Sequence, residues 1–286
     1  MSINNFLSGK CMEKNEFFGT RHSIKPKGED KESAYKGISE RGEQLSRERA
    51  HDLMALVDRA PEGAVIFIGG SSDQIRTKST AEVYGEEMKK IVTEESKDIV
   101  VINRNDIADS QKGYSQIVGG VVEKINAEPT KKVVVDFPMF LKEFSIGGGK
   151  FLDASGGMNE FTKKLLELGG TEEGALKKWI ESEGIIDGIV GPKPKEIAED
   201  QLNGIKRLFK FAKKNIGQER PIVIGFVGHS WTLDVLAIYL AKGSEVTMEG
   251  FEKIGGSMSK ETEMVELSIH NNKGIFKYRG SEYEIK

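Results

Sequence analysis

The sequence predicts an α/β fold in which helices cover a mostly parallel sheet. Short β-branched runs alternate with longer amphipathic stretches along the 286 residues, a pattern typical of parallel strands that are connected by helices. The chain is 37% hydrophobic and 30% charged, so it has enough apolar residues for a sizeable core. We therefore expect one domain over residues 1–286, elaborated by insertions.

The first third of the chain contains two strand–helix pairs. Glu16 to Thr20 is a short strand, and Ser39 to Asp58 is a helix that the Ser39 side chain can cap. Val65 to Ile68 is the next strand, and a Gly-Gly-Ser-Ser turn follows it. The helix from Arg76 to Ile91 comes directly afterwards, which places Arg76 near a helix N-terminus.

The middle of the chain is less regular. We expect strands at Ile99 to Asn103 and Lys132 to Phe137, with a helix from Tyr114 to Asn126 between them. Five glycines between Gly147 and Gly157 predict a flexible loop, and Asn159 to Leu168 predicts a helix. We interpret residues 98–130 as an elaborated segment and residues 148–195 as an insertion over one face, which could form a lid.

The regular pattern resumes in the last third. We expect a helix from Glu196 to Asn215, the strand Pro221 to Val227 and a helix from Leu233 to Ala241. The tail predicts two antiparallel strands, Glu263 to His270 and Gly274 to Arg279, joined by a turn at Asn271 and Asn272.

Composition excludes several classes of function. The net charge of −3 gives no general attraction to nucleic acid or to an anionic membrane. A single cysteine, Cys11, excludes an internal disulfide framework and a cysteine-based metal site, and the N-terminus lacks the apolar run of a signal peptide. The longest apolar runs fall far short of the roughly 20 residues that span a bilayer. We expect a cytoplasmic protein that has no nucleic-acid or membrane partner. The sequence does not specify how many copies of the chain associate.

Five polar residues, four of them where predicted strands run into loops, suggest phosphoryl transfer. Ligands of open α/β sheets bind beyond the carboxyl ends of the strands, so polar residues at these positions are candidates for the binding site. A neutral imidazole attacks phosphorus well, and we assign that role to His22. Arg21 and Arg76 can hold phosphoryl oxygens through forked hydrogen bonds, and His229 can donate another. Glu143 is our candidate for the acid that protonates the leaving oxygen.

Five segments, in order, resemble the histidine phosphatase superfamily, in the branch of the cofactor-dependent phosphoglycerate mutases and many phosphatases. Arg21-His22-Ser23 is similar to its Arg-His-Gly signature, and the other four segments are similar to its first helix start, its arginine turn, its proton-donor segment and its final strand. Those four segments are Ile38 to Gln44, Ser71 to Ala81, Leu141 to Gly147 and Ile222 to Ser230.

The resemblance covers about 150 of the 286 residues. It implies a three-layer α/β/α sandwich of the phosphoglycerate mutase type, with insertions over the active site. It also implies a covalent phosphohistidine on His22, with the other four residues in the roles already given and no cofactor or metal. Ser23, Asp73 and Ser230 replace a glycine, a proline and a glycine of the family pattern. Residues 24–32 lack the Ser and Asn of the mutases, which favours a phosphatase.

Several residues admit other interpretations. Four carboxylates near Glu143 in the sequence could supply the acid instead, and aromatic residues of the central segments could form an apolar wall of the pocket. Lys25 and Lys27 could line its mouth, but loop lysines are more often solvated, so we do not include them in the site. His51 and His270 are set aside as structural, and Gly147 to Lys150 does not complete a phosphate-binding P-loop. The four acids are Glu123, Glu128, Asp136 and Asp153, and the aromatic residues are Phe137, Phe140, Phe144, Phe151 and Trp179.

Three functions compete. The favoured one is a metal-independent phosphatase of small phosphate esters, with a phosphoprotein substrate left open. The second is a phosphomutase of the phosphoglycerate type, which uses the same chemistry but returns the phosphoryl group to the product. The third is a catalytically silent module that binds a phospho-ligand. Retention of both histidines and an acid argues against this third function, because binding alone needs no nucleophile.

Overall fold

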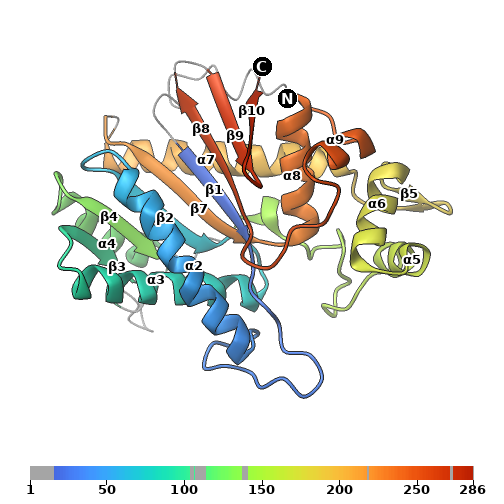
Figure 1. The fold of residues 1–286 in the computed structure, drawn as a ribbon, viewed down its shortest axis with the longest axis horizontal. Helices are drawn as coiled ribbons and strands as arrows, with labels where there is room; N and C mark the ends of the chain where they lie inside the picture. The colour runs from blue at the N-terminus through green and yellow to red at the C-terminus, as the bar shows by residue number, and fades with distance from the viewer. Residues whose placement is uncertain are drawn as a thin grey trace.

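A computed structural model describes residues 16–103, 106, 114–136, 141–217, 219–270 and 273–285. Within these residues, eight strands form one mixed sheet in the order β10-β9-β8-β1-β7-β2-β4-β3 (Figure 1). The five strands from β1 to β3 in this order are parallel, and β8, β9 and β10 extend the sheet in antiparallel fashion. The strand bounds are β1 Glu16–Arg21, β2 Val65–Gly70, β3 Ile99–Ile102, β4 Lys132–Asp136, β7 Ile222–Gly228, β8 Met264–His270, β9 Lys273–Tyr278 and β10 Ser281–Ile285.

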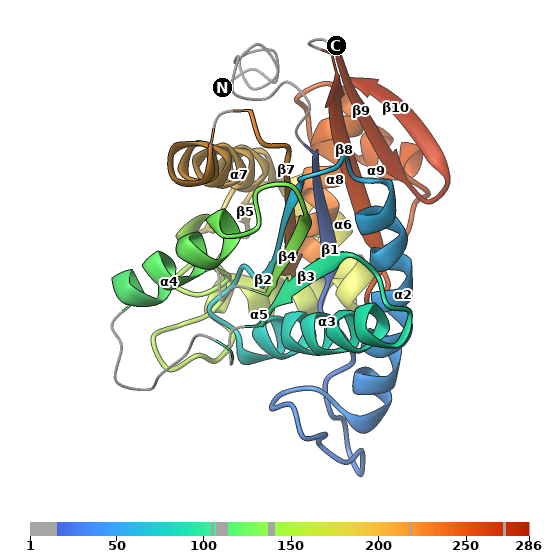
Figure 2. The ribbon, with the colours of Figure 1, turned by 90° about the vertical axis from the view of Figure 1, so that its left-hand side faces the viewer.

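Helices cover both faces of the sheet, which gives three layers (Figure 2). Helices α2 (Glu40–Arg59) and α3 (Ile75–Glu94) pack on one face, and α4 (Tyr114–Asn126), α7 (Pro194–Ile216) and α8 (Ser230–Lys242) pack on the other. Because both faces are buried, the parallel strands are apolar at nearly every position instead of alternating. The predicted α/β class with a mostly parallel sheet is confirmed.

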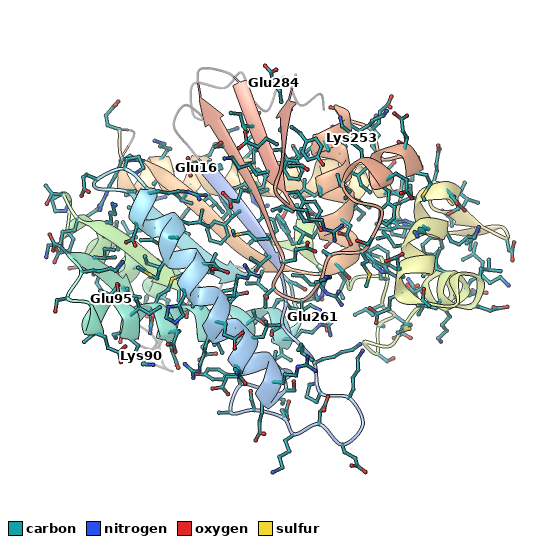
Figure 3. All side chains as sticks on the ribbon, in the orientation of Figure 1. Glu16, Lys90, Glu95, Lys253, Glu261 and Glu284 are labelled. Atoms are coloured by element: carbon teal, nitrogen blue, oxygen red, sulfur yellow. The ribbon has the colours of Figure 1, made fainter. Side chains whose placement is uncertain are left out.

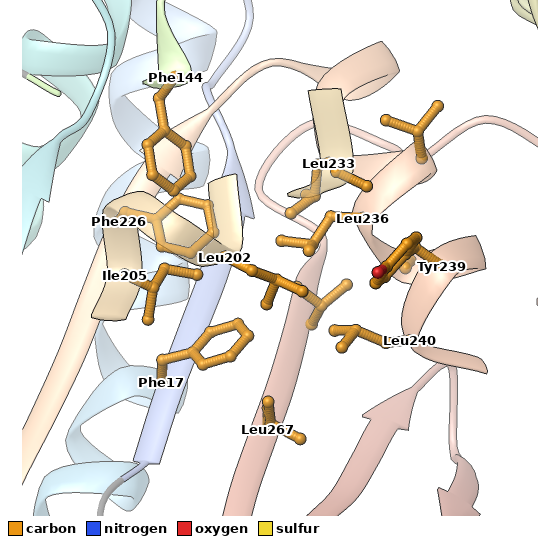
Figure 4. Packing of buried hydrophobic residues seen from close by; sticks show 14 of the residues in the cluster. Phe17, Phe144, Leu202, Ile205, Phe226, Leu233, Leu236, Tyr239, Leu240 and Leu267 are labelled. Carbon is orange, nitrogen blue, oxygen red and sulfur yellow. The ribbon is translucent and has the colours of Figure 1, made fainter. Parts of the chain in front are cut away.

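The two faces have separate apolar cores. In the larger core, Phe226 of β7 packs against Phe17 of β1 and Phe144, with ring centroids 6.2 Å and 4.7 Å apart (Figure 4). Leu202 of α7 and Leu236 of α8 pack in the same core. Burying side chains of this size stabilises the fold by roughly 1.5–3 kcal/mol each, so this core fixes the helices on the sheet.

Two glycines fix β1 against β7. Phe18 pairs with Gly225 and Gly19 pairs with Phe226 across the two strands. A Cβ on Gly225 would lie 2.1 Å from the Phe18 ring, and a Cβ on Gly19 would lie 2.4 Å from the Phe226 ring. Each ring therefore covers the glycine opposite it, and this complementarity sets the register in which the two strands end side by side.

The predicted elements agree with the structure at most positions. The Ser39 hydroxyl caps α2 by accepting from the Gly42 N–H at 3.1 Å, as expected. The antiparallel tail is confirmed, although the expected turn at 271–272 lies outside the described residues. Strand β10 was missed, because the hairpin before it turns at Arg279 and Gly280, both with positive φ, and not at an Asn-Gly pair.

Residues 148–195, which we call the α5–α6 segment, hold more structure than the sequence indicated. Helix α5 (Glu160–Gly169) matches the expected helix at 159–168. Helix α6 (Glu172–Ser182) and the hairpin of β5 (Ile185–Ile186) and β6 (Ile189–Val190) fill the stretch left unassigned. The short helices η3 (Lys142–Phe144) and α9 (Met248–Lys253) were not expected. Among the described helices, none is both long and apolar enough to cross a membrane.

Candidate active site

Two neighbouring strands bring the two candidate histidines together. Arg21, the last residue of β1, pairs with Gly228, the last residue of β7, so His22 and His229 follow at the same level. The His22 N–H donates to the Gly228 carbonyl at 2.9 Å. The imidazole rings are both buried, with their centroids 5.1 Å apart and their planes at 67°. Residues separated by about two hundred positions thus form one pair.

Arg76 joins the two histidines. It lies in the first turn of α3, after a tight turn that follows β2. Its Nε donates to Nε2 of His22 at 3.0 Å, and one terminal nitrogen donates to Nδ1 of His229 at 3.3 Å. The turn needs Gly70, because a Cβ there would lie 2.5 Å from the backbone nitrogen of Lys78. The position of Arg76 near the N-terminus of α3, which the sequence predicted, therefore lets its guanidinium donate to both rings.

Hydrogen bonds fix the tautomers of the two neutral rings. Nδ1 of His22 lies 2.7 Å from the carbonyl oxygen of Ser23, which can only accept, so Nδ1 carries the proton and Nε2 keeps its lone pair. In His229, Nδ1 accepts from Arg76, so Nε2 carries the proton and donates to the Ser72 hydroxyl at 2.9 Å. Each ring therefore presents one unprotonated nitrogen to Arg76, and in His22 that nitrogen is Nε2, the candidate nucleophile.

Burial keeps both imidazoles neutral. It lowers the pKa of His22 from 6.5 to about 3, and the positive charge of Arg76 acts in the same direction. Burial also lowers the pKa of His229 well below 6.5, with His22 and Arg76 as further causes. A neutral imidazole is the form that can attack phosphorus, so the site is poised for covalent chemistry near neutral pH.

The segment that precedes β8 holds the Arg21 side chain through a hydrogen bond and an ion pair. One terminal nitrogen donates to the carbonyl of Ser259 at 2.5 Å. The Ser259 N–H in turn donates to the buried carboxyl of Asp234 in α8 at 3.0 Å, and burial raises the pKa of Asp234 to about 7. The other terminal nitrogen of Arg21 makes ion pairs with Glu261 at 3.2 Å and Glu172 at 3.7 Å. In the view of Figure 3, Glu261 lies at the end of the sheet remote from Glu16, where β1 begins.

One cavity of about 380 Å³ lies at the carboxyl edge of the parallel strands, and it is lined by Arg21, His22, Arg76 and His229. That volume falls in the usual range of small-molecule sites. Its other walls come from the loop between β1 and α2, from the first turn of α2, from the α5–α6 segment and its approach, and from the residues around Glu261. The remaining lining residues are Ile24, Lys25, Lys27, Asp30, Arg41, Ile146, Phe151, Leu152, Met158, Thr162, Leu166, Glu172, Ser230, Trp231, Thr232 and Glu261.

Glu143 is not one of the described residues that line this cavity. It lies in η3 and packs against α7, where a Cβ on Gly204 would lie 3.3 Å from its own Cβ. Its Oε2 accepts from a terminal nitrogen of Arg207 at 2.9 Å. The structure therefore brings Arg21, His22, Arg76 and His229 together, and it places the carboxylate of Glu143 in an ion pair on α7.

The other acids near Glu143 in the sequence do not line the cavity either. Asp136 is buried at the end of β4, and Asp153 accepts from the backbone N–H groups of Ser155 and Gly157 in an exposed loop. Glu128 makes an ion pair with Lys131 at 3.5 Å. Among the acids of the described chain, the cavity instead takes Asp30, Glu172 and Glu261.

Sequence reasoning missed part of the cavity wall. Lys25 and Lys27 line it, although they had been left off the site. Of the aromatic residues proposed for an apolar wall, Phe151 lines the cavity, whereas Phe144 and Trp179 are buried in the core. Phe137 and Phe140 lie outside the described residues. The usable signal was the position of the lysines in the loop that begins at His22, just after β1.

No metal site is evident in the part of the chain that the structure describes, since no group of three or more His, Cys, Asp or Glu residues there could hold an ion. No protein-family model matches the chain, and no curated protein matches its sequence.

Solved structures resemble the chain over most of its length. A mycobacterial glucosyl-3-phosphoglycerate phosphatase is 15% identical, with a TM-score of 0.45 over 89% of this chain and 90% of that one. It has also been solved with inorganic phosphate and with VO3. A structure described as mycobacterial hydrolase 2 is 15% identical, with a TM-score of 0.47 over 94% and 88% of the two chains. The product of an open reading frame of Mycobacterium tuberculosis is 10% identical, with a TM-score of 0.43 over 94% and 98%. At such identities and scores, any function of this chain must be argued from its own residues.

Proposed function

We propose that the protein is a phosphomonoester hydrolase that works through a covalent phosphohistidine on His22. The observation that carries this proposal is the convergence of His22, His229, Arg76 and Arg21 on one cavity, with the lone pair of His22 Nε2 held beside a guanidinium. A site that only recognised phosphate would need the cations but not a neutral, tautomer-fixed imidazole between them.

In the first step, Nε2 of His22 attacks phosphorus and the bond between phosphorus and the ester oxygen breaks. Arg76 moves its hydrogen bonds from the imidazoles to the phosphoryl oxygens, and Arg21 binds them from the other side. His229 contributes a further donor, because charge increases on these oxygens in the transition state. The neighbouring N-terminus of α8, which begins at Ser230, favours the same negative charge.

The departing alkoxide needs a proton, and we propose that Glu143 supplies it. This requires the carboxylate to leave Arg207, to take up a proton from solvent and to reach the leaving oxygen. General acid catalysis of this kind contributes about 10²- to 10⁴-fold. In the second step, water attacks the phosphohistidine, the carboxylate of Glu143 accepts the water proton, and cleavage of the N–P bond restores neutral His22.

A phosphoenzyme experiment tests the proposal. The protein should release phosphate from an aryl phosphate in the presence of a metal chelator, and acid-labile phosphohistidine should be trapped during turnover. The His22→Ala variant should lose about 10³-fold or more in kcat and trap no phosphoenzyme. Robust activity of that variant, or failure to trap a phosphoenzyme on folded protein that binds phosphate, would overturn the proposal. Transfer of the phosphoryl group to an acceptor alcohol faster than to water would identify a mutase instead.

A further inference from the structure

The cavity has a cationic rim beyond the phosphoryl site. Lys25 and Lys27, in the loop between β1 and α2, and Arg41, in the first turn of α2, line the same cavity as Arg21 and Arg76. We call these three residues the cationic rim. All three are exposed, and within the described part of the chain none of them forms an ion pair.

The carboxylates of the cavity do not neutralise this rim. Glu172 and Glu261 both pair with Arg21. Within the described chain Asp30 forms no ion pair with a rim side chain, and it accepts from the backbone N–H of Lys27 at 3.2 Å. The positive charge of Lys25 reaches the catalytic centre, since it is one of the causes that lower the pKa of His22. A chain with a net charge of −3 therefore keeps an unpaired cationic group at the entrance of this cavity.

The facing wall is apolar. Near the α5–α6 segment the cavity is lined by Phe151, Leu152, Met158 and Leu166, and by Trp231 of α8. Phe151 packs edge-on against Trp179 and Trp231, with centroid distances of 5.0 Å and 5.8 Å. The indole N–H of Trp231 donates to the backbone carbonyl of Glu172 at 3.1 Å. Contacts between these aromatic rings hold the wall in place, so the cavity presents a firm apolar surface.

We infer that the substrate is a phosphomonoester whose alcohol part carries both an apolar, ring-sized group and a second anionic group. The apolar group lies against the α5–α6 segment, and the second anion binds at the cationic rim. This inference rests on the proposed phosphatase function. Two arginines and two histidines supply hydrogen-bond donors for a single phosphoryl group. Five cations line the cavity against three carboxylates, so the surplus positive charge at the rim serves another negative charge. An apolar wall stabilises a ring by removing it from water, whereas it leaves hydroxyl groups unpaired.

Matched substrates test each feature separately. Phenyl phosphate is the reference, and its 3- and 4-carboxyl derivatives add an anion. The corresponding carbamoyl derivatives are neutral isosteres, and glycerol phosphate lacks the ring. We expect kcat/KM for the better carboxyl derivative to exceed that of its carbamoyl isostere by about tenfold at low ionic strength, and the ratio to fall as salt is added.

Variants assign the preference to residues. Combined replacement Lys25→Gln, Lys27→Gln and Arg41→Gln should bring the carboxyl-to-carbamoyl ratio close to one. Lys31→Gln, an exposed lysine of the same loop that does not line the cavity, should keep the wild-type ratio. Met158→Ser should lower the preference for phenyl phosphate over glycerol phosphate by about threefold. Leu168→Ser, a similarly exposed residue of α5 outside the cavity, should leave it unchanged.

The outcomes separate this inference from the proposed function. Hydrolysis of phenyl phosphate with equal rates for carboxyl and carbamoyl derivatives would overturn the substrate class and leave the phosphatase intact. The same conclusion follows if Lys31→Gln reduces the ratio as much as the triple replacement. If none of these esters is hydrolysed by folded protein, the phosphatase proposal fails, and the substrate class fails with it.

Discussion

The two sides of the cavity are built in opposite ways. The side formed by the sheet edge carries His22, His229 and Arg76, which are held by hydrogen bonds to one another and to the backbone. The side formed by the α5–α6 segment carries apolar side chains, and some of them, such as Met158, are nearly half exposed. The first side is fixed by the register of β1 and β7, and the second is fixed by packing of the inserted segment on itself and on Trp231 of α8.

This difference indicates a division of labour. Groups that must meet a transition state within fractions of an ångström are placed where strand pairing and burial leave them no freedom. Groups that select among substrates lie on loops and helices outside the sheet, where changes cost the core little. We therefore expect substitutions on the sheet side to change kcat, and substitutions on the α5–α6 side to change KM.

Among the substitutions that compare the two sides, replacement of Arg76 by lysine should give the largest effect. Lysine keeps the charge but loses the fork that reaches both His22 and His229, so kcat should fall by about 10²- to 10³-fold.

Leu166→Ala on the facing wall should raise KM by less than tenfold with kcat nearly unchanged. Steady-state kinetics on one aryl phosphate measures both. Equal losses of kcat in the two variants would remove the distinction between the two sides.

The sheet side was largely predictable from the sequence, and the other side was not. His22, Arg76 and His229 each follow an apolar strand, and the carboxyl ends of parallel strands must share one edge, so their meeting follows from strand order alone. Helix α6 and the hairpin after it have no such constraint. Their burial depends on long-range partners, such as Trp179 against Phe151, that no local periodicity specifies.

Glu143 marks the boundary of what the sequence could predict. It lies in η3, the next element after β4 in the described chain. The direction of its side chain depends on Arg207, sixty-four residues further along the chain, and on the absence of a side chain at Gly204. Pairwise contacts of that kind are decided by tertiary packing, so sequence spacing could name the residue but not its partner.

A second test of the difference between the two sides asks which carboxyl group protonates the leaving oxygen. Glu143 lies beside the sheet, and Glu172 lies on the α5–α6 side. If Glu143 is the acid, Glu143→Gln should lose about 10²-fold in kcat on an alkyl phosphate and only a few-fold on p-nitrophenyl phosphate, whose leaving group needs no proton. Glu172→Gln should instead lower KM for both esters by about threefold, because it frees Arg21 from a competing carboxylate.

The two variants control for each other, since both replace a carboxylate by its neutral isostere near the same cavity. A loss that depends on the leaving group in Glu172→Gln, with none in Glu143→Gln, would move the acid to the α5–α6 side. Phosphoenzyme trapping with p-nitrophenyl phosphate should remain intact in Glu143→Gln, which separates proton donation from nucleophilic attack.

The last effect concerns stability and belongs to the sheet side alone. The pKa of His22 is about 3 in the folded chain and 6.5 when unfolded, so between these values only the unfolded chain binds the proton. The contribution of His22 to stability is therefore full above about pH 6.5 and is lost as the pH falls toward 3. From pH 7 to pH 5 this one group should remove about 2 kcal/mol from the free energy of unfolding. His229, whose pKa is also lowered, acts in the same direction.

Urea unfolding at pH 7 and pH 5 measures this loss. His22→Asn removes the titrating ring while keeping a polar group in its place, so its stability should depend less steeply on pH than that of the wild type, by about 2 kcal/mol over the two units. The Leu166→Ala variant should keep the wild-type dependence, because it changes no titrating group. An unchanged slope in His22→Asn would mean that the imidazole is not held neutral by burial, and the neutral nucleophile of the proposed mechanism would lose its physical basis.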